Sequence, residues 1–92
     1  MANYKVVKGA NYRGYVRDVV GTMYSAGVHH FTLSELCEWG GIPNTVSLRL
    51  ALDDLCLLGY LSVEPEELRT VKNVRVYVLN SAVWLKRGYK PE

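Results

Sequence analysis

Long apolar runs are absent from this chain of 92 residues. No stretch of about 18 apolar residues is present, so we expect no membrane span. The N-terminus carries no apolar segment of the signal-peptide kind, so we expect a cytoplasmic protein. Internal repeats, low-complexity runs and interdomain linkers are also missing. We therefore expect one small domain over residues 1–92, whose modest core would gain from pairing with a second copy.

Residues that bind metals are scarce. The chain has 2 cysteines and 2 histidines, and they show no CxxC or HxxxH spacing. His29 and His30 are adjacent, and adjacent side chains of a strand point to opposite sides. We therefore expect no metal and no cofactor, and no small-molecule ligand is evident. Cys37 is expected to pack as an inert thiol in the core, whereas a bridge within or between chains stays open for Cys56.

The apolar content of 49% excludes a disordered chain. The net charge is only +2, but the charges are segregated along the sequence. Residues 1–20 carry a net charge of +3, residues 21–68 of −6 and residues 69–92 of +5. Both ends are therefore basic and the middle is acidic. If the ends meet in space, they form a basic surface that the mild total conceals.

The stretch from Phe31 to Leu61 contains two helical patterns separated by a short turn. Thr32 and Glu35 form a capping box at the start of the first helix, and Gly41 follows its end. Asn44 is the expected N-cap of the second helix. A core-facing stripe continues along that helix at Leu48, Leu52, Leu55 and Leu58.

Another helix is expected on each side of this stretch. The first spans residues 11–26, with Asn11 as its N-cap and a core stripe at helical spacing that comprises Tyr12, Val16, Val19, Val20 and Met23. A last short helix is expected over residues 81–87. Between the central stretch and this last helix, residues 60–64 and 71–79 read as the two strands of a hairpin. Alternation in the second strand predicts that Val74, Val76 and Val78 face the helices, while Arg75 and Tyr77 face outward.

Three pieces of the central stretch carry a resemblance to a known family. They are Thr32-Leu33-Ser34-Glu35-Leu36, Gly41-Ile42 and Leu58-Gly59-Tyr60-Leu61. Together they resemble the winged helix-turn-helix DNA-binding superfamily, of the small transcription-regulator type. The resemblance implies an α+β fold with a three-helix core, a β-hairpin wing over residues 60–79 and a short C-terminal helix. It places the helix-turn-helix at residues 32–58 and a short strand at residues 28–31.

The same resemblance implies double-stranded DNA as the partner, with the second helix of the pair in the major groove. Its N-terminal end offers polar side chains suited to bases and phosphates, namely Asn44, Thr45, Ser47 and Arg49. The wing offers cations for the phosphate backbone or the minor groove, namely Arg69, Lys72 and Arg75. The face of this helix opposite the leucine stripe, here called the outward face, comprises Val46, Arg49, Leu50, Asp53 and Leu57.

A homodimer is the expected assembly of a regulator of this kind. Gly14 and Gly21 lie seven residues apart on the first helix and would permit close approach of a second copy, with Tyr15 beside them. The alternative is that the helix simply tolerates two weak helix formers. Trp84 is a candidate anchor of the same contact, and its alternative is packing on the core of its own chain.

Three functions remain to be weighed. The first is a DNA-binding transcription regulator. The second is a winged-helix protein-interaction module within a larger assembly, which the acidic middle, Trp39 and the apolar Leu50 and Leu57 favour. An enzyme is not expected, because GxGxxG, HExxH, a phosphate-binding loop and a nucleophile elbow are all absent.

Overall fold

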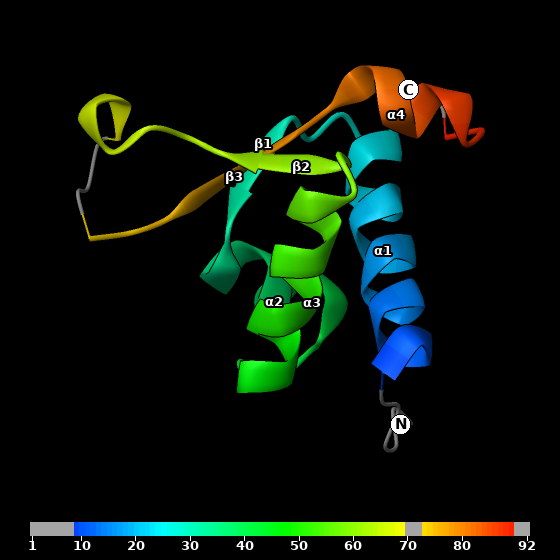
Figure 1. The fold of residues 1–92 in the computed structure, drawn as a ribbon, viewed down its shortest axis with the longest axis horizontal. Helices are drawn as coiled ribbons and strands as arrows, with labels where there is room; N and C mark the ends of the chain where they lie inside the picture. Colours follow the sequence, from blue (N-terminus) through cyan, green and yellow to red (C-terminus); the bar gives the residue numbers. More distant parts are fainter. Residues whose placement is uncertain (1–8, 70–72, 90–92) are drawn as a thin grey trace.

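The computed structural model describes residues 9–69 and 73–89, which form a small α+β domain (Figure 1). In chain order, the elements are α1 (Gly9–Ser25), β1 (His30–Thr32), α2 (Leu33–Gly40), α3 (Val46–Leu57), β2 (Leu61–Val63), the 3-10 turn η1 (Glu66–Leu68), β3 (Val76–Leu79) and α4 (Ser81–Lys86). Asn11 lies inside α1, so its expected role as N-cap is wrong. No helix of the described residues is long and apolar enough to cross a membrane.

Local hydrogen bonds define both ends of α2, as the sequence predicts. The backbone N–H of Glu35 donates to Thr32 Oγ1 at 3.2 Å, and Glu35 Oε1 accepts from the backbone N–H of Thr32 at 2.9 Å. This reciprocal pair is the expected capping box. Gly41 follows the helix with φ of +64°, a conformation in which a side chain would be strained, and its N–H donates to the Cys37 carbonyl.

The N-cap of helix α3 lies one residue later than expected. Its N-cap is Thr45, whose Oγ1 accepts from the Leu48 N–H at 3.2 Å, so the assignment of Asn44 as N-cap is wrong. Leu48, together with Leu52 and Leu55, is buried, but Leu58 is 57% exposed. Ten residues at about 100° each place Leu58 about 80° away from Leu48, which takes it off the stripe.

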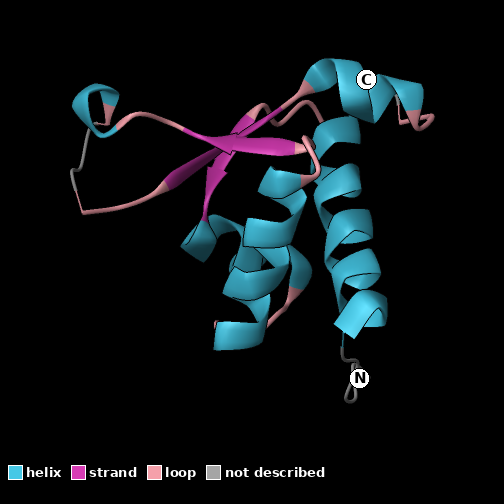
Figure 2. Ribbon diagram, viewed as in Figure 1, coloured by secondary structure: helices cyan, strands magenta, loops and turns pink. Residues whose placement is uncertain are grey.

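The three strands form one antiparallel sheet in the order β1-β3-β2 (Figure 2). Strand β1 therefore joins the hairpin, as the resemblance implies, with Phe31 opposite Tyr77. The predicted facing of β3 is wrong, because Tyr77 and Leu79 are buried while Val76 and Val78 are only partly buried and Val74 is exposed. Alternation alone fits either face, and the stacked rings of Phe31 and Tyr77, with centroids 5.6 Å apart, select this one.

The core lies between α1, α3 and the inner face of the sheet, and α4 closes its end (Figure 1). Trp84 of α4 is completely buried, and its indole Nε1–H donates to the Tyr60 carbonyl at 3.0 Å. Its ring packs against Tyr24, Tyr60 and Tyr89. An aromatic group thus ties the C-terminal helix to α1 and to the start of the hairpin.

Candidate nucleic-acid interface

The outward face of α3 is uncovered in the single chain. Each of its five residues is exposed, and Leu57 is exposed by 85%. The opposite side of the helix packs on α1 and β2. In Figure 1, the N-terminal end of α3 lies at the far end of the molecule from α4. A surface with this exposure and position is sterically available to a partner.

The polar residues at the N-terminal end of α3 are all exposed. Asn44 precedes the helix, and Thr45 is its cap, so the Thr45 hydroxyl already accepts one backbone hydrogen bond. Ser47 lies in the first helical turn. Arg49 lies two residues further on, at the end of the same turn, and has no ion-pair partner among residues 9–69 and 73–89. The end of the helix therefore offers a cation and small polar groups in one place.

Both aspartates of α3 are paired with arginines from other parts of the chain. Asp53 lies 3.7 Å from Arg75, which precedes β3, and Asp54 lies 3.5 Å from Arg13 of α1. These side chains are roughly half exposed, so each pair contributes at most about 1 kcal/mol to stability. The pairs nevertheless offset the two negative charges that would repel phosphate.

The hairpin cations differ in their surroundings. Arg69 is partly buried, and its Nε–H donates to the Glu64 carbonyl at 3.1 Å, which holds the loop after β2. Arg75 is exposed beside α3. A hydrogen bond to Tyr77 raises the pKa of Arg75, so the guanidinium stays charged. Lys72 lies outside the described residues. The structure thus brings Arg75 beside the outward face, and it gives Arg69 a role in shaping the loop.

No family model, curated protein or solved structure matches this chain. Among the described residues, no group of three His, Cys, Asp or Glu side chains comes together in a way that could hold a metal ion.

Two of the expected dimer contacts are made inside the chain instead. A Cβ placed on Gly21 would collide with the ring of Tyr89, so the close approach at this glycine is made by the protein's own C-terminal segment. Trp84 is buried in its own core, so it presents no surface to a second copy. Gly21 and Trp84 are therefore wrong as interface residues. Gly14 and Tyr15 are partly exposed, and a Cβ on Gly14 would meet only Arg17 at 3.9 Å.

The two cysteines are free thiols and are partly buried. Burial raises the pKa of Cys37. Burial also raises the pKa of Cys56, as does the charge of Asp53, while Arg75 lowers it. A raised pKa reduces the thiolate fraction at neutral pH, and the thiolate is the reactive form.

The two arginine–aspartate pairs and the anchoring of Trp39 do not follow from the sequence. Trp39 Nε1–H donates to Thr22 Oγ1 at 3.0 Å, across 17 residues of sequence. Opposite charges in segregated segments signal that pairs between segments are possible. They do not signal which arginine reaches which aspartate, because that depends on how α1 and the hairpin pack on α3.

Proposed function

We propose that this chain is a winged helix-turn-helix protein that binds double-stranded DNA as a transcription regulator. Helix α3 acts as the recognition helix in the major groove, and the hairpin β2–β3 acts as the wing. The order of helices and strands agrees with what the sequence resemblance implies. The single observation that carries the proposal is the uncovered outward face of α3, with Arg49 at its N-terminal end and Arg75 beside it.

In this proposal, the groove contacts divide by chemistry. Arg49 reads a base edge or a phosphate, because its guanidinium has no ion-pair partner in the described part of the chain. Asn44 and Ser47 supply shorter polar contacts at the helix start. Val46 meets the methyl group of a thymine. Arg75 exchanges its exposed ion pair with Asp53 for an ion pair with a phosphate. This exchange costs little free energy because surface ion pairs are weak.

We further propose a homodimer on DNA, with two copies of α3 about one helical turn apart. The part of α1 around Gly14 and Tyr15 is the surface left for such a contact. A small domain of this kind gains stability from burying further apolar surface between copies. Sedimentation velocity of the free protein and of the DNA complex measures the stoichiometry directly.

The test is a fluorescence anisotropy titration with duplex DNA from upstream of the protein's own gene. Replacing Arg49 with Ala is expected to weaken binding by about 1–3 kcal/mol if Arg49 contacts a base. Lys86→Ala is the matched control, since it removes the same charge from α4, away from the N-terminal end of α3 (Figure 1). Unchanged binding by a folded Arg49→Ala variant would remove this residue from the interface.

A second function is favoured by one specific observation. Val46, Leu50 and Leu57 form an exposed apolar row on the same outward face, and rows of this kind mark protein contacts. The second candidate is therefore a protein-interaction module. Salt separates the two functions, because DNA affinity falls steeply with salt in proportion to the number of phosphate contacts. A protein-interaction module would show no duplex binding at low salt.

A further inference from the structure

The exposed side of α3 carries a narrow row of side chains at regular spacing. The row comprises Val46, Leu50, Asp53 and Leu57, at intervals of four, three and four residues. At about 100° per residue, these positions lie within about 60° of one another around the helix. The same intervals separate the seam positions of a two-stranded coiled coil. Because α3 buries its opposite side against α1 and β2, the row is a second helix-packing surface, and all four of its residues are exposed in the described chain.

The row is self-complementary about its middle, at the level of Ala51. Arg49 lies two residues before this level, and Asp53 lies two residues after it. Both are at the same edge of the row, about 40° apart around the helix. The apolar ends are Val46, five residues before Ala51, and Leu57, six residues after it. A symmetric dimer requires a surface that matches itself under a two-fold rotation, whereas an unrelated partner does not require this match.

Two antiparallel copies of α3 bring these groups together. When the two-fold axis crosses the row at the level of Ala51, Val46 of each copy lies against Leu57 of the other. Arg49 of each copy then meets Asp53 of the other, because a contact across a two-fold axis occurs twice. Leu50 lies next to the axis and contacts its own counterpart. Apolar contacts thus form along the row, and two ion pairs flank its centre.

The charged groups can make these pairs. Arg49 has no ion-pair partner in the described part of the chain. Asp53 uses Oδ1 for Arg75, at 3.7 Å, so its Oδ2 can accept from a second guanidinium. The other edge of the row is also complementary, since Ser47 and Asp54 lie on either side of the same level. Asp54 uses Oδ2 for its ion pair with α1, so its Oδ1 can accept from a serine hydroxyl.

We propose that a second copy of this chain binds the outward face, through an antiparallel pair of α3 helices around a two-fold axis. The contact involves two helices of 12 residues. This is small for a protein interface, so the dimer is weak and dissociates on dilution. It differs from the contact around Gly14 and Tyr15, and it forms without DNA. One consequence rests on the proposed function: this dimer covers α3, so the second copy and duplex DNA compete for the same face.

The experiment is sedimentation equilibrium of the full chain without DNA, from micromolar to millimolar concentration. A reversible equilibrium between monomer and dimer is the expected result. Arg49→Asp places two carboxylates opposite each other and is expected to weaken dimerisation about tenfold or more. The double variant Arg49→Asp, Asp53→Arg exchanges the two charges and is expected to restore the dissociation constant to within about threefold of the wild-type value.

Leucine variants locate the contact. Leu50 and Leu85 are similarly exposed, by 58% and 51%, and each lies on a helix. Leu50→Ser removes an apolar contact beside the axis from both copies and is expected to weaken dimerisation about tenfold or more. Leu85→Ser removes the same side chain from α4 and is expected to leave the dissociation constant within about twofold. Circular dichroism of each variant confirms that the fold is intact before its dissociation constant is compared.

Three outcomes would overturn the dimer. The first is a monomer at every concentration. The second is a dimer that Leu50→Ser weakens no more than Leu85→Ser does, because its contact then lies elsewhere. The third is a double charge variant that dimerises no better than Arg49→Asp, because Arg49 and Asp53 then do not meet.

Titration with duplex DNA judges the proposed function separately. A protein that stays monomeric in sedimentation and still binds duplex DNA contradicts the α3 dimer alone. A protein that dimerises through α3 and binds no duplex at low salt contradicts the regulator alone.

Discussion

At the scale of single residues, the most informative side chain is Asp53. It pairs with Arg75, and its charge also acts on the thiol of Cys56. The carboxylate raises the pKa of this thiol, while the guanidinium lowers it. Asp53 and Cys56 are close in sequence and Arg75 is distant from both. The three nevertheless form one electrostatic unit at the junction of α3 and the hairpin. Changing one of them is expected to alter the titration of another.

The first residue-scale prediction concerns the reactivity of Cys56. Because its pKa is raised, its thiolate forms at a higher pH than that of an ordinary thiol, and alkylation is slow near neutral pH. Asp53→Asn removes a charge that raises the pKa, so the midpoint of the pH–rate profile should move to lower pH. Iodoacetamide labelling of a Cys37→Ser background measures it. A midpoint that moves upward in the Asp53→Asn variant would contradict the assignment.

The second residue-scale prediction uses the two glycines of α1 as a matched pair. Alanine at Gly14 has room and should stabilise the fold by about 0.5–1 kcal/mol through helix propensity. Alanine at Gly21 gains the same propensity, but it displaces Tyr89, which donates to Asp18 at 3.2 Å and packs on Trp84. In urea denaturation, the free energy of unfolding of Gly21→Ala should be lower than that of Gly14→Ala by about 1 kcal/mol or more.

The control for this pair removes the colliding ring. In a Tyr89→Ala background, alanine at Gly21 meets no ring and should be as favourable as alanine at Gly14. A double-mutant cycle reports the coupling between positions 21 and 89 directly. Zero coupling would show that the aromatic contact contributes nothing in solution.

At the scale of elements, local hydrogen bonds decide where helices begin. Thr32 and Glu35 cap α2, and Thr45 caps α3. Each cap satisfies an N–H group that has no partner within its own helix. The turn that follows Gly41 joins the two capped helices. The Thr45 cap sets the start of α3, the helix that presents the outward face. Loss of either cap is expected to lower the free energy of unfolding.

The element-scale prediction is that Thr32→Ala destabilises the protein by about 1 kcal/mol, because Glu35 N–H loses its acceptor. Ser34→Ala is the matched control. Ser34 is exposed in the first turn of α2, outside the capping box, so its replacement should change stability by less than about 0.5 kcal/mol. Thermal and urea denaturation measure both variants. Equal stability of the two variants would show that the cap is not formed in solution.

At the scale of the whole molecule, the segregated charges pair between segments within the described residues. Each end sends an arginine to the acidic middle: Arg13 from α1 to Asp54, and Arg75 from the hairpin to Asp53. The pairing places positive charge beside α3 and offsets its aspartates. Electrostatic attraction to DNA is therefore expected to be moderate and sensitive to the removal of either aspartate.

The whole-molecule prediction is that Asp53→Asn increases DNA affinity, because Arg75 is released for phosphate and a repelling charge is lost. The slope of log affinity against log salt should steepen by up to about one phosphate contact. Glu38→Gln changes the net charge equally, but Glu38 lies on α2 and, among the described residues, is not the ion-pair partner of Arg75. Glu38→Gln should therefore increase DNA affinity less than Asp53→Asn does. Equal effects of both variants would mean that only net charge matters.

The sequence by itself determined the order of the elements, the capping box of α2, the left-handed Gly41 and most of the buried stripes, namely Val16, Val20 and Met23 of α1 and Leu48, Leu52 and Leu55 of α3. These features depend on hydrogen bonds and side-chain spacing within one or two helical turns, so neighbouring residues suffice to predict them. The outward face of α3 was predicted for the same reason, since a helix that buries one side must expose the other.

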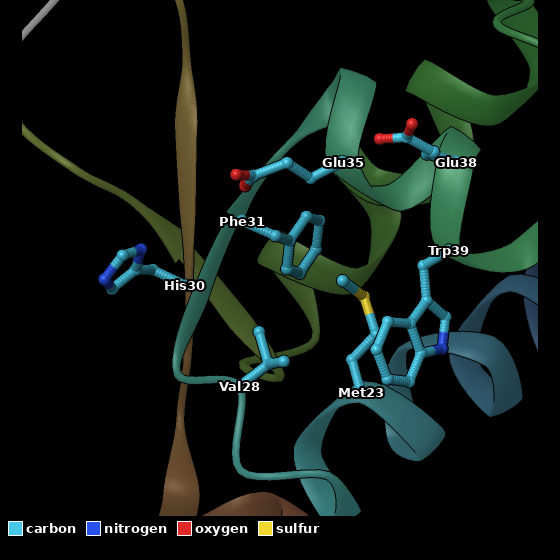
Figure 3. Close-up of a pocket in the computed structure, with 7 residues that line it drawn as sticks. All are labelled: Met23, Val28, His30, Phe31, Glu35, Glu38 and Trp39. Carbon is cyan, nitrogen blue, oxygen red and sulfur yellow. The ribbon is translucent and has the colours of Figure 1, made fainter.

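Only the tertiary structure decided which face of β3 is buried, where Trp84 packs and what occupies the space over Gly21. Trp84 bonds to a carbonyl 24 residues away, and Tyr89 to a carboxylate 71 residues away. The open hollow beside Trp39 is likewise lined by residues of α1, β1 and α2 together (Figure 3). Such contacts depend on how separate elements fit one another in three dimensions, and local periodicity carries no information about that fit.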